Sequence, residues 1–207
     1  MRLFLCLWFC LLLSCGPSTE SKEVFSEDGV LYERYEIMAD SSIHGIYYRF
    51  YPSGAVAETA TYDKGKRQGV RYLFYENGQI EDELPYRDDI LHGTKKHYYD
   101  TGGLQLECEV VQGKIQGIFK AYYPNGQVKE EVTFVDDLEN GPFTEYHENG
   151  KLKTQGAYRN GDKEFGLLSM YDEAGLLVKK MECDTMGICR TIWTADNENP
   201  AADVTDK

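Results

Sequence analysis

Residues 117–134 read GIFKAYYPNGQVKEEVTF. The Asn125-Gly126 pair in the middle of this stretch accepts a positive φ at little cost, and such pairs are the strongest short signal of a β-hairpin. Aromatic and β-branched residues flank the pair on both sides, as they do in β-strands. The stretch therefore predicts two antiparallel strands joined by a tight turn.

The same pattern recurs along the chain with a period of 24 residues, extended once to 25. The glycines that begin the units are Gly45, Gly69, Gly93, Gly117, Gly141 and Gly166. If each is position zero, a second glycine stands at position 9, an aromatic residue at position 5 and an aliphatic residue at position 11. Such regular columns are the mark of a repeat architecture. We predict an all-β fold, an elongated antiparallel sheet of tandem 24-residue hairpins.

The connection between successive units is predicted to be a tight turn. One column there holds Gly65, Asp89, Gly113, Asp137 and Gly161. Glycine and aspartate share a tolerance of left-handed backbone, so we expect that conformation at this position. The pairs Asp88-Asp89 and Asp136-Asp137 resemble paired catalytic carboxylates, but their place in this column identifies them as turn residues.

Alternation along the unit predicts which side chains are buried. Positions 1, 5, 11, 15 and 17 are mostly apolar and share odd parity, so we expect them to line one buried face. Positions 12 and 14 are mostly charged and are expected to face water. The acidic members at position 14 are Glu83, Glu107 and Glu131.

Position 6 is an exception to this alternation, because it holds Tyr51, Tyr75, Tyr99 and Tyr123. Equivalent residues lie two strands apart, which is roughly 10 Å at about 4.8 Å per strand. Two interpretations remain open. The tyrosines either cover one face of the sheet as amphipathic side chains or form a row of aromatic contacts for a partner.

The amino-terminal residues indicate export. An apolar run from Leu3 to Leu13 follows Arg2; it is too short to span a bilayer and fits the core of a signal peptide. Leu12-Leu13-Ser14-Cys15 resembles the lipobox of bacterial lipoproteins, which implies lipidation of Cys15 and removal of residues 1–14. The alternative is an ordinary secretory signal with a cysteine placed by chance. We expect residues 15–26 to form a flexible tether.

Charge and composition exclude several classes of function. The net charge of −13 disfavours binding to nucleic acids and to anionic lipid surfaces, so contact with a membrane is expected through a lipid anchor only. Outside the repeat columns we find no cluster of His, Cys, Ser or acidic residues and no phosphate-binding loop. The sequence predicts a protein that is not an enzyme and has no cofactor or metal site.

The cysteines after residue 15 have separate predicted roles. Cys108 takes position 15 of its unit and is expected to be a small core residue. Cys183 and Cys189 flank a turn into a capping strand at 188–193, and they form either a disulfide or two buried thiols. Residues 194–207 read as a disordered tail.

The whole pattern resembles the MORN repeat (membrane occupation and recognition nexus) in its bacterial variant form. Gly117 to Gly141 matches this pattern best, and the resemblance extends over residues 27–183, with the array ending at 193. Residues 27–31 look like the second half of an earlier unit. The resemblance implies a binding module, since relatives are labelled antitoxins, scaffolds or lipid binders.

The sequence thus predicts a lipoprotein of the bacterial envelope, anchored in the outer membrane, that serves as a protein-binding module or scaffold. The candidate contacts are the residues Tyr51, Tyr75, Tyr99, Tyr123, Glu83, Glu107 and Glu131. Because the chain is acidic, a basic protein is the expected partner. The alternative is an immunity or antitoxin-like protein that neutralises a basic toxin.

Overall fold

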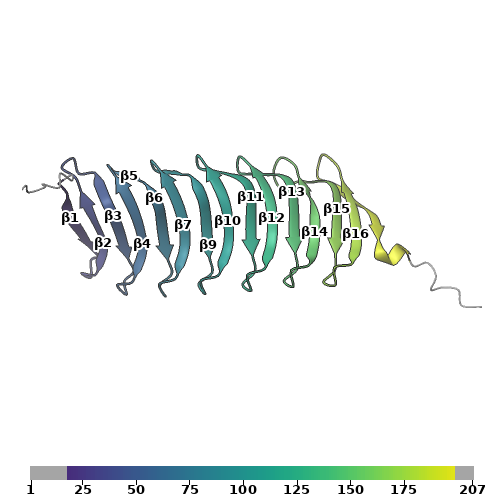
Figure 1. Cartoon of the computed structure of the whole chain (residues 1–207), viewed down its shortest axis with the longest axis horizontal. Helices are drawn as coiled ribbons and strands as arrows, with labels where there is room; N and C mark the ends of the chain where they lie inside the picture. Colours follow the sequence, from purple (N-terminus) through teal and green to yellow (C-terminus); the bar gives the residue numbers. More distant parts are fainter. Residues whose placement is uncertain (1–17, 199–207) are drawn as a thin grey trace, which may run out of the picture.

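A computed structural model describes residues 18–198, which form one sheet of 17 strands (Figure 1). Cys15 and the predicted signal peptide lie outside these residues, as do residues 199–207. The strands are β1 (Glu20–Phe25), β2 (Leu31–Ile37), β3 (Ile43–Phe50), β4 (Val56–Asp63), β5 (Lys66–Arg67), β6 (Gly69–Phe74), β7 (Ile80–Arg87), β8 (Ile90–Leu91), β9 (Gly93–Tyr98), β10 (Leu104–Val111), β11 (Lys114–Tyr122), β12 (Val128–Val135), β13 (Leu138–Tyr146), β14 (Leu152–Tyr158), β15 (Glu164–Tyr171), β16 (Leu177–Cys183) and β17 (Cys189–Thr194). A short 3₁₀ helix, η1 (Ala195–Glu198), follows β17. No helix among the described residues is long and apolar enough to cross a membrane.

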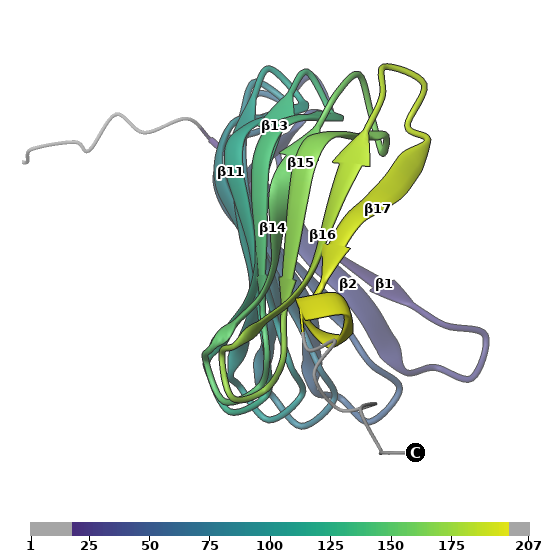
Figure 2. The same cartoon turned by 90° about the vertical axis from the view of Figure 1, so that its right-hand side faces the viewer.

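The strands pair antiparallel with their neighbours along the chain, which makes the fold a continuous meander. The hairpins are β1–β2, β3–β4, β6–β7, β9–β10, β11–β12, β13–β14 and β15–β16, and β17 closes the array. The predicted all-β repeat fold is therefore confirmed. The sheet forms a single layer, and its strands are bowed when seen along its length (Figure 2).

The array begins earlier than the sequence predicts. Residues 20–25, which we expected in a flexible tether, form β1, and β1 pairs with β2 as a complete hairpin. The predicted half unit is therefore wrong. The polar composition of β1, ESKEVF, hid it, because an edge strand of one layer can expose nearly all its side chains. At the other end, residues 195–198 of the predicted tail form η1.

The pairing register assigns the two faces differently from the prediction. Phe119 at position 2 pairs with Val132 at position 15, and Ala121 at position 4 pairs with Glu130 at position 13. Directly paired residues share a face, so even positions of the first strand lie with odd positions of the second. We call the face with positions 2, 4, 13, 15 and 17 the inner face, and the face with positions 1, 3, 5, 14 and 16 the outer face.

The prediction that all odd positions line one buried face is therefore wrong. Ile118, at position 1, is 56% exposed on the outer face, whereas Val132, at position 15, is 2% exposed on the inner face. A register shift between Ala121 and Tyr122 adds one residue to the second strand, so Tyr122 pairs with Val128. Residues of the same parity before and after the hairpin turn therefore do not lie on the same face. Half-buried Tyr122 lies on the outer face.

Buried apolar side chains lie along the inner face, with Ala60 in the amino-terminal half, Cys108 and Val110 in the middle, and a cluster in the carboxy-terminal half. The fully buried members of this cluster are Val132, Phe143, Leu168 and Cys183, and partly buried Phe134, Tyr158, Met170, Met181 and Cys189 pack against them. The rings of Phe143 and Tyr158 stack with centroids 4.3 Å apart. Cys108 is a free buried thiol, as predicted, and burial raises its pKa. Because the sheet has one layer, these side chains are covered by one another.

The turns between units link each hairpin to the next. Gly65, Asp89, Gly113, Asp137 and Gly161 all have positive φ, which confirms the predicted left-handed column. The amide of Asp137 donates to the carbonyl of Ile115, 3.1 Å away, and the other members of the column repeat this bond. The Asp137 carboxylate accepts from the Ile115 amide at 2.7 Å. These aspartates therefore join successive turns, in agreement with their predicted structural role.

Candidate functional site

The four position-6 tyrosines form a hydrogen-bonded ladder along the edge where the hairpin turns lie. Each hydroxyl donates to the backbone carbonyl 23 residues later, at position 5 of the next unit. The oxygen-to-oxygen distances are 2.6, 2.7, 2.7 and 2.9 Å for Tyr51, Tyr75, Tyr99 and Tyr123. In the next unit, His147 places Nε2 2.9 Å from the carbonyl of Tyr171. All four tyrosines are half-buried, and they hold neighbouring hairpins together.

We expect Tyr123→Phe to lower the free energy of unfolding by about 1 kcal/mol. The change removes one hydroxyl and leaves the carbonyl of Tyr146 without this donor, and a typical intramolecular hydrogen bond contributes about that much. A urea titration measures the effect. Tyr32→Phe is the matched control, because exposed Tyr32 lies outside the ladder. Equal losses in the two variants would contradict a stabilising role for the ladder.

The three predicted acidic contacts lie in one row across the middle of the outer face, interleaved with lysines. Glu83 pairs in register with Lys96, Lys96 with Glu107, Glu107 with Lys120, and Lys120 with Glu131. The Lys120 Nζ to Glu131 Oε1 distance is 2.8 Å. The row therefore alternates in charge, which weakens the acidic field that these glutamates would otherwise produce.

Tyrosines of the following units also bind two of these glutamates. Tyr98 donates its hydroxyl to Glu83 at 3.0 Å, and Tyr122 donates to Glu107 at 2.7 Å. Burial and the hydrogen bond to the glutamate raise the pKa of both tyrosines to about 12. The position-6 tyrosines lie at the hairpin-turn edge and the glutamates in mid-strand, so the structure places the two predicted sets in separate rows.

The inner face carries a buried ionic group in its amino-terminal half, which the sequence analysis missed. Glu58 is 6% exposed and lies between two arginines. Its carboxylate accepts from Arg71 Nε at 2.7 Å, from Arg71 Nη2 at 2.9 Å and from Arg49 Nε at 3.2 Å. Burial alone would raise the pKa of Glu58, but the hydrogen bonds and charge of the two arginines lower it. These three residues stand at positions 13, 2 and 4, so the correct pairing register would have brought them together.

Farther along the inner face, two carboxylates oppose each other. Glu130 and Glu145 are direct partners of β12 and β13, and like charges in that arrangement are destabilising. Burial, followed by the charges of Glu145 and Glu139, raises the pKa of Glu130. Lys153 Nζ lies 3.4 Å from Glu145 Oε2, and the charges of Lys129 and Lys153 offset only part of the rise at Glu130. On the inner face, the carboxylate of Glu58 in the amino-terminal half is therefore better neutralised than that of Glu130.

Five consecutive units match the family model described as MORN repeat variant, at residues 43–64, 67–88, 91–112, 115–136 and 139–160. Together they cover more than half of the chain. The chain belongs to the MORN repeat variant family. MORN repeats are in general binding modules for proteins or membranes. Hairpins β1–β2 and β15–β16 extend the MORN array beyond the matched residues.

Other comparisons add little to the family assignment. No curated protein matches the chain. A crystal structure of a protein of unknown function from Bacteroides fragilis is similar over 80% of this chain and 91% of that chain. The two share 10% sequence identity and superpose with a TM-score of 0.16, which supports no structural or functional inference.

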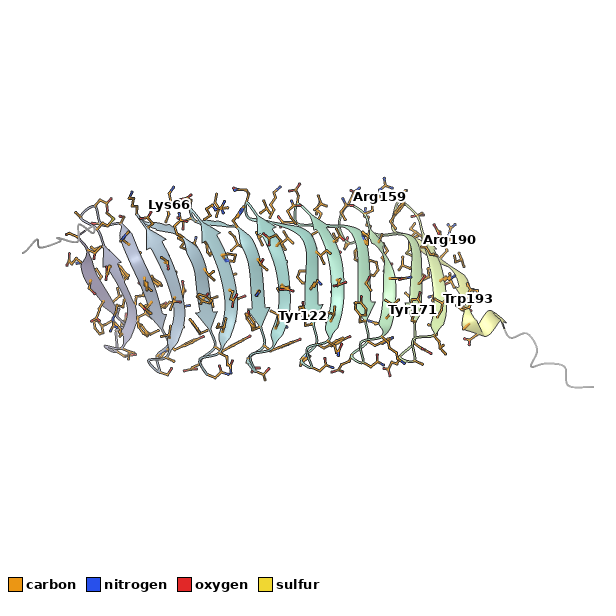
Figure 3. All side chains as sticks on the ribbon, viewed as in Figure 1. Lys66, Tyr122, Arg159, Tyr171, Arg190 and Trp193 are labelled. Atoms are coloured by element: carbon orange, nitrogen blue, oxygen red, sulfur yellow. A yellow bond between two sulfur atoms is a disulfide. The ribbon has the colours of Figure 1, made fainter. Side chains whose placement is uncertain are left out.

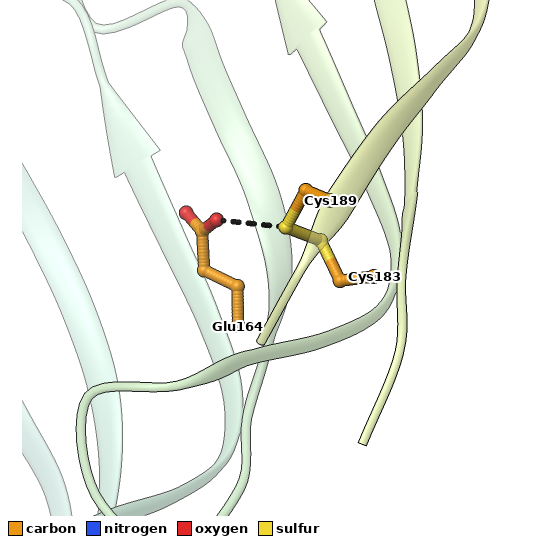
Figure 4. A group of neighbouring side chains, drawn as sticks. All are labelled: Glu164, Cys183 and Cys189. Carbon is orange, nitrogen blue, oxygen red and sulfur yellow. Dashed lines mark hydrogen bonds between the residues drawn. A yellow bond between two sulfur atoms is a disulfide. The ribbon is translucent and has the colours of Figure 1, made fainter. Parts of the chain in front are cut away.

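The last MORN hairpin is joined to the capping strand by a disulfide between Cys183 and Cys189 (Figure 4). Glu164 Oε2 lies 3.3 Å from Cys189 Sγ. Within residues 18–198, these three side chains form the one group whose ligand atoms are spaced for a metal ion. Metal binding needs thiolates, whereas both sulfurs are in the disulfide. The disulfide form of this group therefore offers a single carboxylate to an ion.

Side chains extend along the whole MORN array and project at both of its edges (Figure 3). Lys66 and Arg159 lie at the edge of the unit-to-unit turns, and Tyr122 and Tyr171 lie toward the hairpin turns. Polar residues recur from unit to unit, and no unit among the described residues has a cluster of acid, base and nucleophile of its own. The surface is suited to contacts that are distributed along the array.

Proposed function

We propose that this MORN array is the protein-binding part of a lipid-anchored envelope protein. The observation that carries the proposal is the single layer of the sheet. No second layer covers the outer face within residues 18–198, so its repeated side chains remain open to a partner over the whole length of the array (Figure 1). A capture experiment tests the proposal. Solubilised envelopes are passed over the immobilised mature chain, and a saturable, stoichiometric protein partner is the expected result.

The same experiment separates this proposal from the immunity-like alternative, which the net charge of −13 favours. Capture of an envelope-assembly or structural protein supports the scaffold. Capture of a basic toxin, with loss of its toxicity on binding, supports the alternative. A chain that captures no protein at stoichiometric amounts would contradict both.

The lipid anchor is proposed at Cys15, which follows Leu12-Leu13-Ser14. Because β1 begins at Glu20, the connecting segment is shorter than the twelve residues that the sequence analysis assigned to a tether. An extended chain reaches at most about 3.6 Å per residue, so the span from Cys15 to β1 is at most about 18 Å. An anchor at Cys15 would hold the first hairpin close to the lipid headgroups.

We expect Cys15→Ala to move the protein from the membrane fraction to the soluble fraction. The reason is that the array, with its net negative charge, has little affinity of its own for anionic lipid surfaces. Fractionation measures the distribution, and mass spectrometry of the mature amino terminus measures the modification. An unmodified mature chain that begins at any other residue would rule out the lipid anchor.

Binding to a basic partner is expected to weaken with salt. Carboxylates spaced about 10 Å apart lie near one Debye length at physiological ionic strength, so each acts weakly and together they speed association. We predict that replacing Glu83, Glu107 and Glu131 together by glutamine slows association more than any single replacement. The interleaved lysines limit this effect to a fewfold change. Stopped-flow or biosensor on-rates measure it, and an on-rate indifferent to salt would contradict distributed electrostatics.

A further inference from the structure

The outer face carries exposed aliphatic side chains at the first position of several units. Ile46, Ile118 and Leu167 are 52%, 56% and 49% exposed, and Pro142 occupies the same position between the last two. Their neighbours on the inner face, such as Leu168, are buried, so the core does not require these exposed residues to be apolar. A row of exposed apolar residues is a feature of interaction surfaces.

Three hollows lie along this row in the carboxy-terminal half, each over the second strand of a unit or hairpin. The hollow over β12 lies between Ile118 and Pro142. The hollow over β14 is lined by Pro142, Leu167 and Phe165 and has a volume of about 490 Å³. The hollow over β16 lies between Phe165 and the pair Ile188 and Ile192, with about 530 Å³. Pro142 lines the first two hollows and Phe165 the last two, so the three form a row that crosses the strands. We call this row the outer groove.

The spacing of the hollows selects the conformation of a ligand. Successive hollows are two strands apart, or about 9.6 Å. A polyproline II helix has three residues per turn and advances about 9.3 Å per turn, so every third side chain meets the next hollow. In an extended β-strand, side chains on one face repeat at about 6.7 Å, which does not fit this spacing. An α-helix repeats its face after seven residues, or about 10.5 Å, and drifts by roughly 1 Å at each unit.

The charges along the outer groove select the composition of the ligand. Glu131 borders the hollow over β12, while Glu182 and Asp184 border the hollow over β16. Glu131 is paired with Lys120, and Arg190 lies in register with Glu182. The Asp184 carboxylate accepts from the backbone amides of Met186 and Ile188, so it remains a fixed negative charge. Glu131 and Glu182 are thus largely compensated, so Asp184 and the net charge of −13 favour a basic ligand over an acidic one.

We propose that the outer groove, from β11 to β17, binds a proline- and lysine-containing segment of a partner protein in the polyproline II conformation. One turn of the segment lies on each hairpin, with a proline of every turn in a hollow and the lysines toward the carboxylates. Proline-rich segments bind shallow grooves of this kind because their conformation is already ordered before binding. This inference rests on the proposed protein-binding function and names its site and ligand class.

Synthetic peptides of two to six Pro-Pro-Lys repeats test the proposal, with the full mature chain as receptor and calorimetry as the measurement. Affinity is expected to rise with each added tripeptide until the peptide fills all three hollows, and then to level off. A peptide of the same composition and length with its residues shuffled is the control for charge. Equal affinity of the shuffled peptide would overturn the proposal, because charge alone would then account for binding.

Ile118→Ser and Leu167→Ser test the site. Both side chains are exposed, so the fold should be retained, whereas each loss of an apolar contact is expected to weaken binding about tenfold. Leu176→Ser is the matched control, because Leu176 is exposed in a hairpin turn and lines none of the three hollows. Equal losses at Leu176 would overturn the assignment of the groove.

Three further outcomes bear on the occupant. If the two serine variants change the oligomeric state in light scattering, the groove binds a second copy of this chain and the proposal is wrong. If they abolish binding to neutral phosphatidylcholine vesicles, the groove faces lipid and the proposal is also wrong. If a captured envelope protein binds both variants with unchanged affinity, the groove proposal fails while the protein-binding function stands.

Discussion

Leu168→Ala is expected to lower the free energy of unfolding by about 2–5 kcal/mol, the range for large-to-small changes at buried aliphatic sites. Leu168 is 0% exposed and packs with Val132, Phe143 and Cys183. The space around it is filled. A methyl group built on Gly156 would lie 3.1 Å from Leu168 Cγ and 2.8 Å from Phe143 Cε1. Removal of the isobutyl group therefore leaves a cavity in the carboxy-terminal cluster.

Leu167→Ala is the matched control, one residue away on the outer face. Leu167 is 49% exposed, and we expect its loss to change stability by about 0.5 kcal/mol or less. Guanidinium titrations compare the two variants. Because repeat arrays are stabilised unit by unit, hydrogen exchange should locate the loss of protection in β13–β17. Equal destabilisation by the two changes would show that the inner and outer faces are assigned wrongly.

The sequence predicts the repeat, the hairpins and the turns because each is coded by a few neighbouring residues. Asn125-Gly126 and the column of Gly65 and Asp89 reflect backbone preferences that need no tertiary contact. The same holds for the buried Cys108, which occupies an apolar column. These local signals are sufficient to predict the architecture of a meander, since each strand pairs with the next strand along the chain.

The assignment of faces depends on pairing register and could not be read from alternation alone. The register shift between Ala121 and Tyr122 adds one residue within the hairpin, and it reverses the parity of everything that follows. Antiparallel alignment of the two strands about the hairpin turn would have placed Phe119 beside Val132. It would also have placed Tyr122 on the face opposite the core.

The role of the position-6 tyrosines depends on a contact between units. Tyr123 donates to the carbonyl of Tyr146, and this contact has no signature in the sequence except that the tyrosine recurs. The recurrence is compatible with both a structural and a partner-binding interpretation. The structural role is now visible, whereas binding through the same side chains stays a prediction.

Glu58→Gln is expected to lower the free energy of unfolding at pH 7 by about 2 kcal/mol or more, because the change leaves Arg49 and Arg71 without the carboxylate between them. Breaking a fully buried pair costs about 3–5 kcal/mol, and the partial exposure of both arginines reduces this cost. Urea titrations at several pH values measure the effect. A loss below about 0.5 kcal/mol at pH 7 would show that the ionic group contributes little to the fold.

The pH dependence provides a second readout with a defined sign. The folded structure lowers the pKa of Glu58 below its ordinary value of 4.5, so the stabilisation is fully present above that pH and is lost as the pH falls through the lowered value. The difference in unfolding free energy between wild type and Glu58→Gln should therefore narrow below about pH 4.

Glu130→Gln is the matched control, with an expected effect of opposite sign. Burial and Glu145 raise the pKa of Glu130, so its charge destabilises the fold at neutral pH, and the variant should be more stable than wild type there. A difference between Glu58→Gln and wild type that is constant with pH would mean that the loss comes from altered packing instead of from the carboxylate charge.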